Sequence, residues 1–202
     1  MLSEKKMVIG QSSLDFLGVN ISDGKYTLQP HIASSLGEFP DKLTNTKQIQ
    51  QFLGIVNYMS DFIPKVSRYR NCLAQLLKKS PLEWNSTHTE AVQQLKRLSE
   101  KLPPLQIPGP GKRILQTDAS DEYWAAALFE EMDGKRNICG YKSGAFKPSE
   151  LHYHYTFKEI LAVKHGIEKF QFHLLGHNFL VEMDMSSFPK MLQFKRKILP
   201  HP

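Results

Sequence analysis

Three carboxylates in three different kinds of predicted element are the residues of this chain best suited to chemistry. Asp118 ends a predicted strand, Glu159 lies inside an amphipathic helix, and Asp184 ends a second strand. Carboxylate oxygens are the ligands that Mg²⁺ prefers, and two such ions can hold the attacking and leaving oxygens of a phosphodiester. If the elements bring these acids together, the sequence predicts a metal-dependent nuclease.

Two of the acids also have an ordinary structural interpretation. Asp118 lies in the segment TDAS (117–120), which fits the turn chemistry at a strand end. Asp184 follows an apolar run and precedes a helix start expected at Ser186 and Ser187, so it also fits a helix cap. Both interpretations remain open on the sequence alone.

Glu159 is harder to interpret as a surface group. On a helix expected over residues 156–175, its own face carries Ala162, Val163, Gly166 and Phe170. A carboxylate on an apolar face needs a partner, a metal or a proton, because burying an unpaired charge is costly. The side chains expected to face solvent on this helix are Lys158, His165, Lys169 and His173.

The elements that position these acids follow a proline-rich segment. Strand signals occupy residues 113–118, 123–130 and 137–145, and a further strand is expected over 178–184, after the helix. A turn at Asp133 and Gly134 joins two of the strands as a hairpin. Three antiparallel strands, a helix and a strand that can pair parallel with the first predict an α/β layer with a mixed sheet.

The first half of the chain predicts a hairpin and several amphipathic helices. Residues 16–21 and 26–28 flank Asp23 and Gly24, which is a hairpin signal. A short helix is expected from Pro30 to near Gly37. Three longer helices follow: one capped by Asn45 or Thr46, one after Pro64, and one that opens with a capping box of Thr87 and Glu90.

Two segments of the second half resemble the ribonuclease H domain of reverse-transcribing elements. They are residues 115–124 (LQTDASDEYW) and 153–163 (YHYTFKEILAV). The pair Tyr123 and Trp124, with residues 143–146 (SGAF), resembles plant pararetroviruses of the caulimovirus group more than gypsy-class LTR retrotransposons. Residues 52–64 (FLGIVNYMSDFIP), followed by 82–84 (LEW), resemble the segment after the polymerase palm in these enzymes.

The resemblance implies a division of the chain into four parts. Residues 1–37 would be the end of the polymerase palm with a hairpin like the primer grip, and 38–102 a helical thumb or connection region. Residues 103–111, rich in proline and glycine, would be a linker. Residues 112–202 would be a ribonuclease H-like domain that is truncated at its C-terminal end.

The resemblance also implies the chemistry. Asp118, Glu159 and Asp184 would hold two Mg²⁺ or Mn²⁺ ions, and the substrate would be the RNA strand of an RNA–DNA hybrid. Four side chains are candidates for contacts to the hybrid backbone: Lys142, Ser143, Lys147 and Thr156. Each of them also fits an ordinary surface position.

Two nearby features carry a weaker metal signal. Glu182 shares a strand face with Asp184, but we do not expect it to assist at the metal. His152 and His154 form a His-x-His pair, which usually means exposed imidazoles in a turn, and we do not predict a zinc site there.

Two departures from the family pattern limit these expectations. The Tyr-x-Asp-Asp turn of the polymerase site does not occur in the chain, so we expect no DNA synthesis from it. The family's domain continues to a fourth metal-binding Asp, whereas no acid follows Asp184 here. We therefore expect a fragment of a reverse transcriptase, whose remainder is a possible partner. The alternative is a catalytically inactive relic that only binds nucleic acid or has no function.

Composition is compatible with this interpretation. A formal net charge of +6 suits a polyanionic partner, and a hydrophobic content of 41% argues against a disordered chain. Cys72 and Cys139 form no Cys-x-x-Cys pair and predict reduced thiols. The sequence shows no apolar run of transmembrane length and no secretory signal, so we expect a soluble, intracellular protein without a membrane partner.

Overall fold

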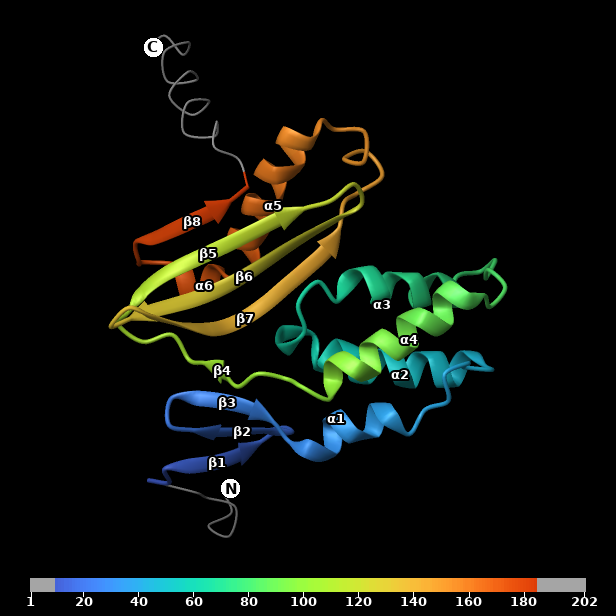
Figure 1. The fold of residues 1–202 in the computed structure, drawn as a ribbon, viewed down its shortest axis with the longest axis horizontal. Coiled ribbons are helices and arrows are strands. Elements are labelled where there is room, and N and C mark those ends of the chain that lie inside the picture. Colours follow the sequence, from blue (N-terminus) through green and yellow to red (C-terminus); the bar gives the residue numbers. More distant parts are fainter. Residues whose placement is uncertain (1–9, 185–202) are drawn as a thin grey trace, which may run out of the picture.

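Two sheets and a group of helices beside them make up the structure, a computed structural model that describes residues 10–184 (Figure 1). The first sheet contains the N-terminal hairpins, and the second sheet contains the strands that follow the proline-rich segment. Figure 1 shows the helices α1 to α4 alongside these sheets. The mixed α/β class expected from the sequence is confirmed.

The first sheet is antiparallel and has the strand order β1-β2-β3-β4. Its strands are β1 (Ser13–Phe16), β2 (Val19–Ser22), β3 (Lys25–Leu28) and β4 (Leu105–Gln106). The predicted hairpin around Asp23 and Gly24 is confirmed, with φ angles of 51° and 69°. The single strand predicted over 16–21 is wrong, because Leu17 and Gly18 adopt positive φ and turn the chain between β1 and β2.

The helical unit, defined as α1 to α4 with two short 3-10 turns, packs around one hydrophobic core. Its elements are α1 (Pro30–Gly37), α2 (Thr46–Tyr58), η2 (Ser60–Phe62), α3 (Ser67–Ala74), η3 (Gln75–Leu77) and α4 (Ser86–Ser99). The predicted limits of α1 are confirmed, and Asn45 caps α2 by accepting a hydrogen bond from the backbone of Gln48. The fully buried side chains at its centre include Phe52, Val56, Leu73, Val92 and Leu95.

The predicted cap of α4 is wrong. The capping box pairs Asn85 with His88: the backbone N–H of His88 donates to Asn85, and the backbone N–H of Asn85 donates to the His88 ring. The ring of His88 lies 5.5 Å from that of Trp84. Because this buried contact favours His88 at the third helical position, α4 begins at Ser86, and Thr87 lies inside it.

The second sheet has the strand order β7-β6-β5-β8. Its strands are β5 (Lys112–Ala119), β6 (Tyr123–Met132), β7 (Lys135–Ala145) and β8 (Phe179–Met183). Asp118 lies on β5, and Asp184 directly follows β8. The antiparallel pairing of the first three, the Asp133–Gly134 turn and the parallel pairing of β8 with β5 are confirmed. β8 lies at an edge of this sheet.

Two helices cover one face of the second sheet, behind the strands in Figure 1. They are α5 (Tyr155–Lys169) and α6 (Gln171–Leu174), so the single helix predicted over 156–175 is divided at Phe170, whose side chain is buried in the core of this sheet. The expected solvent exposure of Lys158 is also wrong. This side chain is buried, and its ammonium donates to the carbonyl of Asp121 at 2.7 Å.

Three polar side-chain contacts connect the second sheet to the rest of the molecule. The Lys142 ammonium of β7 lies 2.7 Å from a carboxylate oxygen of Asp61 in η2. The backbone N–H of Ser67 in α3 donates to the hydroxyl of Ser143 at 3.0 Å. The hydroxyl of Tyr26 in β3 donates to the carbonyl of Cys139 at 3.1 Å. The sheet is thus joined to both the helical unit and the first sheet.

Candidate active site

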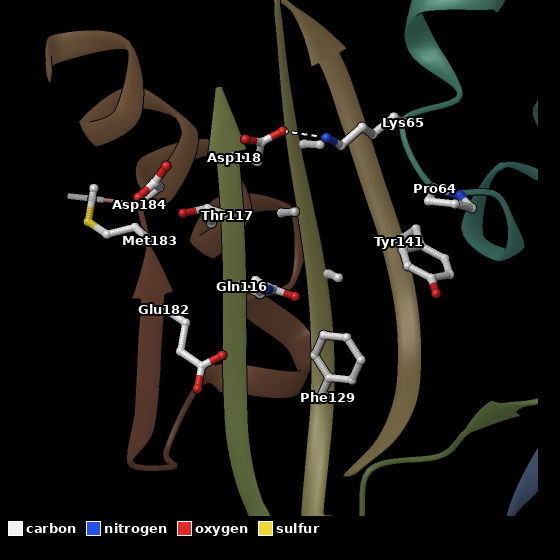
Figure 2. A pocket seen from close by; sticks show the side chains of 13 residues that line it. Pro64, Lys65, Gln116, Thr117, Asp118, Phe129, Tyr141, Glu182, Met183 and Asp184 are labelled. Atoms are coloured by element: carbon white, nitrogen blue, oxygen red, sulfur yellow. Dashed lines mark ion pairs between the residues drawn. The ribbon is translucent and has the colours of Figure 1, made fainter. Parts of the chain in front are cut away.

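Asp118 and Asp184 lie at the same level of two neighbouring strands. β5 and β8 run parallel, and their last paired residues are Thr117 and Met183, so the two acids follow side by side. Figure 2 shows Asp118 at the end of β5 and Asp184 just past β8. Both line a pocket of about 640 Å³. The pocket lies on the sheet face opposite to α5, because Thr117 packs against α5 and its neighbour Asp118 points the other way.

Glu159 comes from α5, on the other face of the sheet, and it is fully buried. Among residues 10–184, neither carboxylate oxygen has a hydrogen-bond partner. Burial raises the pKa of Glu159, and the charges of Asp118 and Asp184 raise it further. Two neighbouring groups, the hydroxyl of Tyr155 and the backbone N–H of Ala119, act in the opposite direction and favour the charged form.

The structure therefore brings two of the predicted acids into one pocket and buries the third. Glu159 does not line the pocket that Asp118 and Asp184 share. Within residues 10–184, no three His, Cys, Asp or Glu side chains lie close enough together to hold one ion. All three acids still act on one neighbour, Tyr155. Its pKa is raised to about 12 by the interaction with Glu159, by burial, and by the charges of Asp184 and Asp118.

Lys65 is the residue at this pocket that sequence reasoning missed. Its ammonium lies 2.6 Å from the Oδ2 atom of Asp118, and the two side chains are 60% and 49% exposed. Figure 2 shows the pair, with Lys65 entering from the segment between η2 and α3. Lys65 has a φ of 52°, which is uncommon for a residue other than glycine. Lys65 is distant from Asp118 in sequence and belongs to no shared motif, so no local pattern pointed to it.

The side chains predicted to contact a hybrid have different surroundings. Lys142 and Ser143 are engaged with the helical unit through Asp61 and Ser67. Lys147 is exposed, while Thr156 is half-buried in the first turn of α5. The hydroxyl of Thr156 lies 3.2 Å from the Nδ1 atom of His154, so Lys147 is the most exposed of these candidates.

Two further residues singled out in the sequence have structural partners. Glu182 lines the pocket, and its two oxygens accept hydrogen bonds from the Arg136 guanidinium at 2.8 and 2.9 Å. His154 caps α5 by accepting from the backbone N–H of Thr156. The helix start predicted at Ser186 and Ser187 lies outside the described residues.

Comparisons with known proteins agree with this architecture. Residues 84–181 match the family described as the RNase H-like domain found in reverse transcriptase. The genome polyprotein of Petunia vein clearing virus is 55% identical over 201 residues, which are 100% of this chain and 9% of the polyprotein. The enzymatic polyprotein of Cauliflower mosaic virus is 38% identical over 203 residues, covering 98% of this chain and 30% of that protein. The chain thus spans a small part of these relatives.

Solved structures show the same fold at low sequence identity. The foamy viral protease-reverse transcriptase in complex with dsDNA superposes with a TM-score of 0.77 and 19% identity, covering 98% of this chain and 41% of that one. The same protein in complex with an RNA/DNA hybrid gives a TM-score of 0.76 and 18% identity over 98% of this chain and 27% of that one.

No helix within residues 10–184 has both the length and the apolar character needed to cross a bilayer. The matched segment, the similarity of the whole chain to viral polyproteins and the shared fold agree with one another. Residues 84–181 of this chain belong to the family of RNase H-like domains found in reverse transcriptases.

Proposed function

We propose that this chain is a part of a pararetroviral reverse transcriptase that hydrolyses the RNA strand of an RNA–DNA hybrid. Hydrolysis of such hybrids is the activity of the family, and its domains generally use divalent metal ions. In this proposal Asp118, Glu159 and Asp184 are the carboxylates at the reacting phosphate, and Mg²⁺ or Mn²⁺ is the ion. Hard oxygen donors of this kind suit both ions.

The buried carboxylate of Glu159 is the observation that most favours metal chemistry. An unpartnered charge inside a protein costs several kcal/mol, so side chains of this kind are paired, protonated or bound to a metal. Glu159 has no protein partner among residues 10–184, and it is held near the strand end that carries Asp118. A bound divalent ion would compensate its charge.

The residues of the chain would have separate roles in this reaction. The chemistry that Mg²⁺ or Mn²⁺ would supply when bound is a water of lowered pKa and stabilisation of the departing 3′ oxygen. Asp118 and Asp184, which line the pocket, would present the negative charge that attracts the ions. Glu159 would add a third carboxylate from α5, near the end of β5. Tyr155, whose pKa is raised to about 12 chiefly by its interaction with Glu159, places its hydroxyl beside that carboxylate.

Recognition of the hybrid would depend on its backbone. Proteins distinguish RNA from DNA through the 2′-hydroxyls of the wide minor groove and through the phosphates. The net charge of +6 favours a polyanion, and Lys147 and Thr156 remain the candidates for direct contacts. The foamy viral structure with an RNA/DNA hybrid is a relative in fold with such a ligand.

The proposal is tested by cleavage of a labelled RNA–DNA hybrid with Mg²⁺ or Mn²⁺, comparing the chain with its Asp118→Asn variant. Asp133→Asn is the matched control, because Asp133 lies in the β6–β7 turn away from the pocket and asparagine tolerates its positive φ. We expect metal-dependent cutting by the chain and by the control, and none by Asp118→Asn. Equal cutting by the two variants would contradict the assignment of Asp118.

A second candidate function is binding of nucleic acid without cleavage. It is favoured by the ion pair of Lys65 with Asp118 and by the lack of a three-acid cluster within residues 10–184. The same assay separates the two functions when hybrid binding is measured alongside. A folded chain that binds the hybrid but cuts it with neither ion would support this second function.

A further inference from the structure

The backbone on both sides of Lys65 is fixed to the body of the protein. Ile63 and Val66 are 1% and 2% exposed, and both pack in the core of the helical unit. The backbone N–H of Ser67 donates to the Ser143 hydroxyl, which in turn donates to the Ser67 hydroxyl at 2.9 Å. The position of the Lys65 Cα over the sheet is thus fixed, whereas 60% of its side chain is exposed and able to move.

The Lys65 ammonium lies at the place where a cation would bind Asp118. It is 2.6 Å from the Oδ2 atom, which is direct ion-pair contact. Lys65 and Asp118 also line a second pocket, of about 340 Å³, next to the one that contains Asp184. The pair therefore lies where the two pockets adjoin.

We propose that Lys65 competes with the divalent ion for Asp118. The ammonium binds the carboxylate when no ion is present, and it must leave when Asp118 becomes a metal ligand. This inference rests on the proposed function, because it takes Asp118 as a ligand. Exposed ion pairs contribute little to stability, so the main effect of this pair falls on what else Asp118 can bind. A nearby positive charge also repels the ion itself.

The test measures metal affinity rather than cleavage. Mn²⁺ binding to the chain without nucleic acid is followed by the electron paramagnetic resonance signal of free Mn²⁺. Lys65→Gln removes the competing charge. Lys164→Gln is the matched control, because the side chain of Lys164 is 64% exposed, its ammonium is paired with Glu168 of α5, and it lines neither pocket. Lys65→Arg retains the charge.

We expect Lys65→Gln to bind Mn²⁺ about two- to fivefold more tightly than the unmodified chain, which is the range that an exposed ion pair supports. Lys164→Gln and Lys65→Arg should bind like the unmodified chain. The gain should shrink at high salt, where the competing charge is screened.

Three results would overturn the proposal. The first is an equal Mn²⁺ affinity in Lys65→Gln and Lys164→Gln. The second is unchanged Mn²⁺ affinity combined with weaker hybrid binding in Lys65→Gln, which would assign Lys65 to the nucleic acid. The third is the absence of Mn²⁺ binding in every variant, which would also remove the proposed metal site. A gain in Mn²⁺ affinity without any hybrid cleavage would support the competition while the proposed hydrolysis fails.

Discussion

Gly166 of α5 lies directly against Ala126 of β6. A β-carbon on residue 166 would come within 3.1 Å of the Ala126 Cβ and 3.3 Å of the Thr117 Cγ2. The missing side chain allows α5 to approach the centre of the second sheet. Because Glu159 lies two turns earlier on the same face of α5, this close packing also determines how near Glu159 comes to the end of β5.

Gly166→Val should therefore destabilise the protein, by about 1–3 kcal/mol, because the branched side chain overpacks a tight interface. Gly54→Val is the matched control, since Gly54 is an exposed position of α2 with nothing within 4 Å of an added β-carbon. That control should be neutral or slightly stabilising, because valine has the better helix propensity. Urea denaturation measures both, and equal losses would contradict the packing argument.

Glu159→Gln should stabilise the metal-free protein at pH 7, by roughly 1–3 kcal/mol, because it removes an unpartnered buried charge. Burial raises the pKa of Glu159 above its ordinary value of 4.5, so the folded protein binds a proton more readily than the unfolded chain. Wild-type stability should then fall as the pH rises from about 4.5 through the raised folded-state pKa.

The advantage of Glu159→Gln should accordingly disappear when the pH falls below about 4.5. Thermal denaturation across this pH range, in the presence of a chelator, makes the comparison. Glu168→Gln serves as control, because Glu168 is 53% exposed on the same helix. Parallel pH curves for the wild type and Glu159→Gln would show that the carboxylate is compensated in the fold.

The pair of Lys142 and Asp61 should couple the second sheet to the helical unit. A double-mutant cycle with Lys142→Met and Asp61→Asn should give an interaction free energy of about 0.5–1 kcal/mol, typical of a partly exposed ion pair. The two side chains are 31% and 39% exposed. Additive effects of the two substitutions in chemical denaturation would mean that the pair contributes nothing to holding these units together.

Gly144→Ala should displace the ring of Trp124, because an added β-carbon would lie 2.7 Å from three atoms of the indole. The ring stacks on His165 at a centroid distance of 5.0 Å, so the substitution should disturb the contact between β6 and α5. A shift in tryptophan fluorescence and a lower melting temperature are the expected results. Gly37→Ala, with open space around it, is the control.

Much of the second sheet was predictable because its signals are local. Alternating apolar residues, the Asp133–Gly134 turn and the helical crossover between β7 and β8 leave few ways to pair the strands. The parallel contact of β5 with β8 follows from the crossover through α5. The adjacent placement of Asp118 and Asp184 is a consequence of that pairing, so two of the three candidate acids could be located from the sequence.

The remaining features depend on contacts between distant segments. The position of Lys65 beside Asp118 arises from the packing of the helical unit against β7, which no local pattern encodes. The burial of Lys158 depends on the carbonyl of Asp121, which comes from the β5–β6 turn. Side chains with long apolar stems are placed inside or outside by such tertiary partners, not by helical periodicity alone.

The pairing of β4 with β3 has a consequence for dividing the chain into expressible pieces. β4 belongs to the first sheet, where Leu105 and Gln106 pair with Tyr26 and Lys25, although it arises within the segment proposed as a linker. A fragment cut before residue 103 would leave the edge of β3 without its neighbour, and an unpaired strand edge favours association with other chains. A soluble N-terminal piece should therefore extend through Ile107, whose backbone N–H still bonds to Gly24.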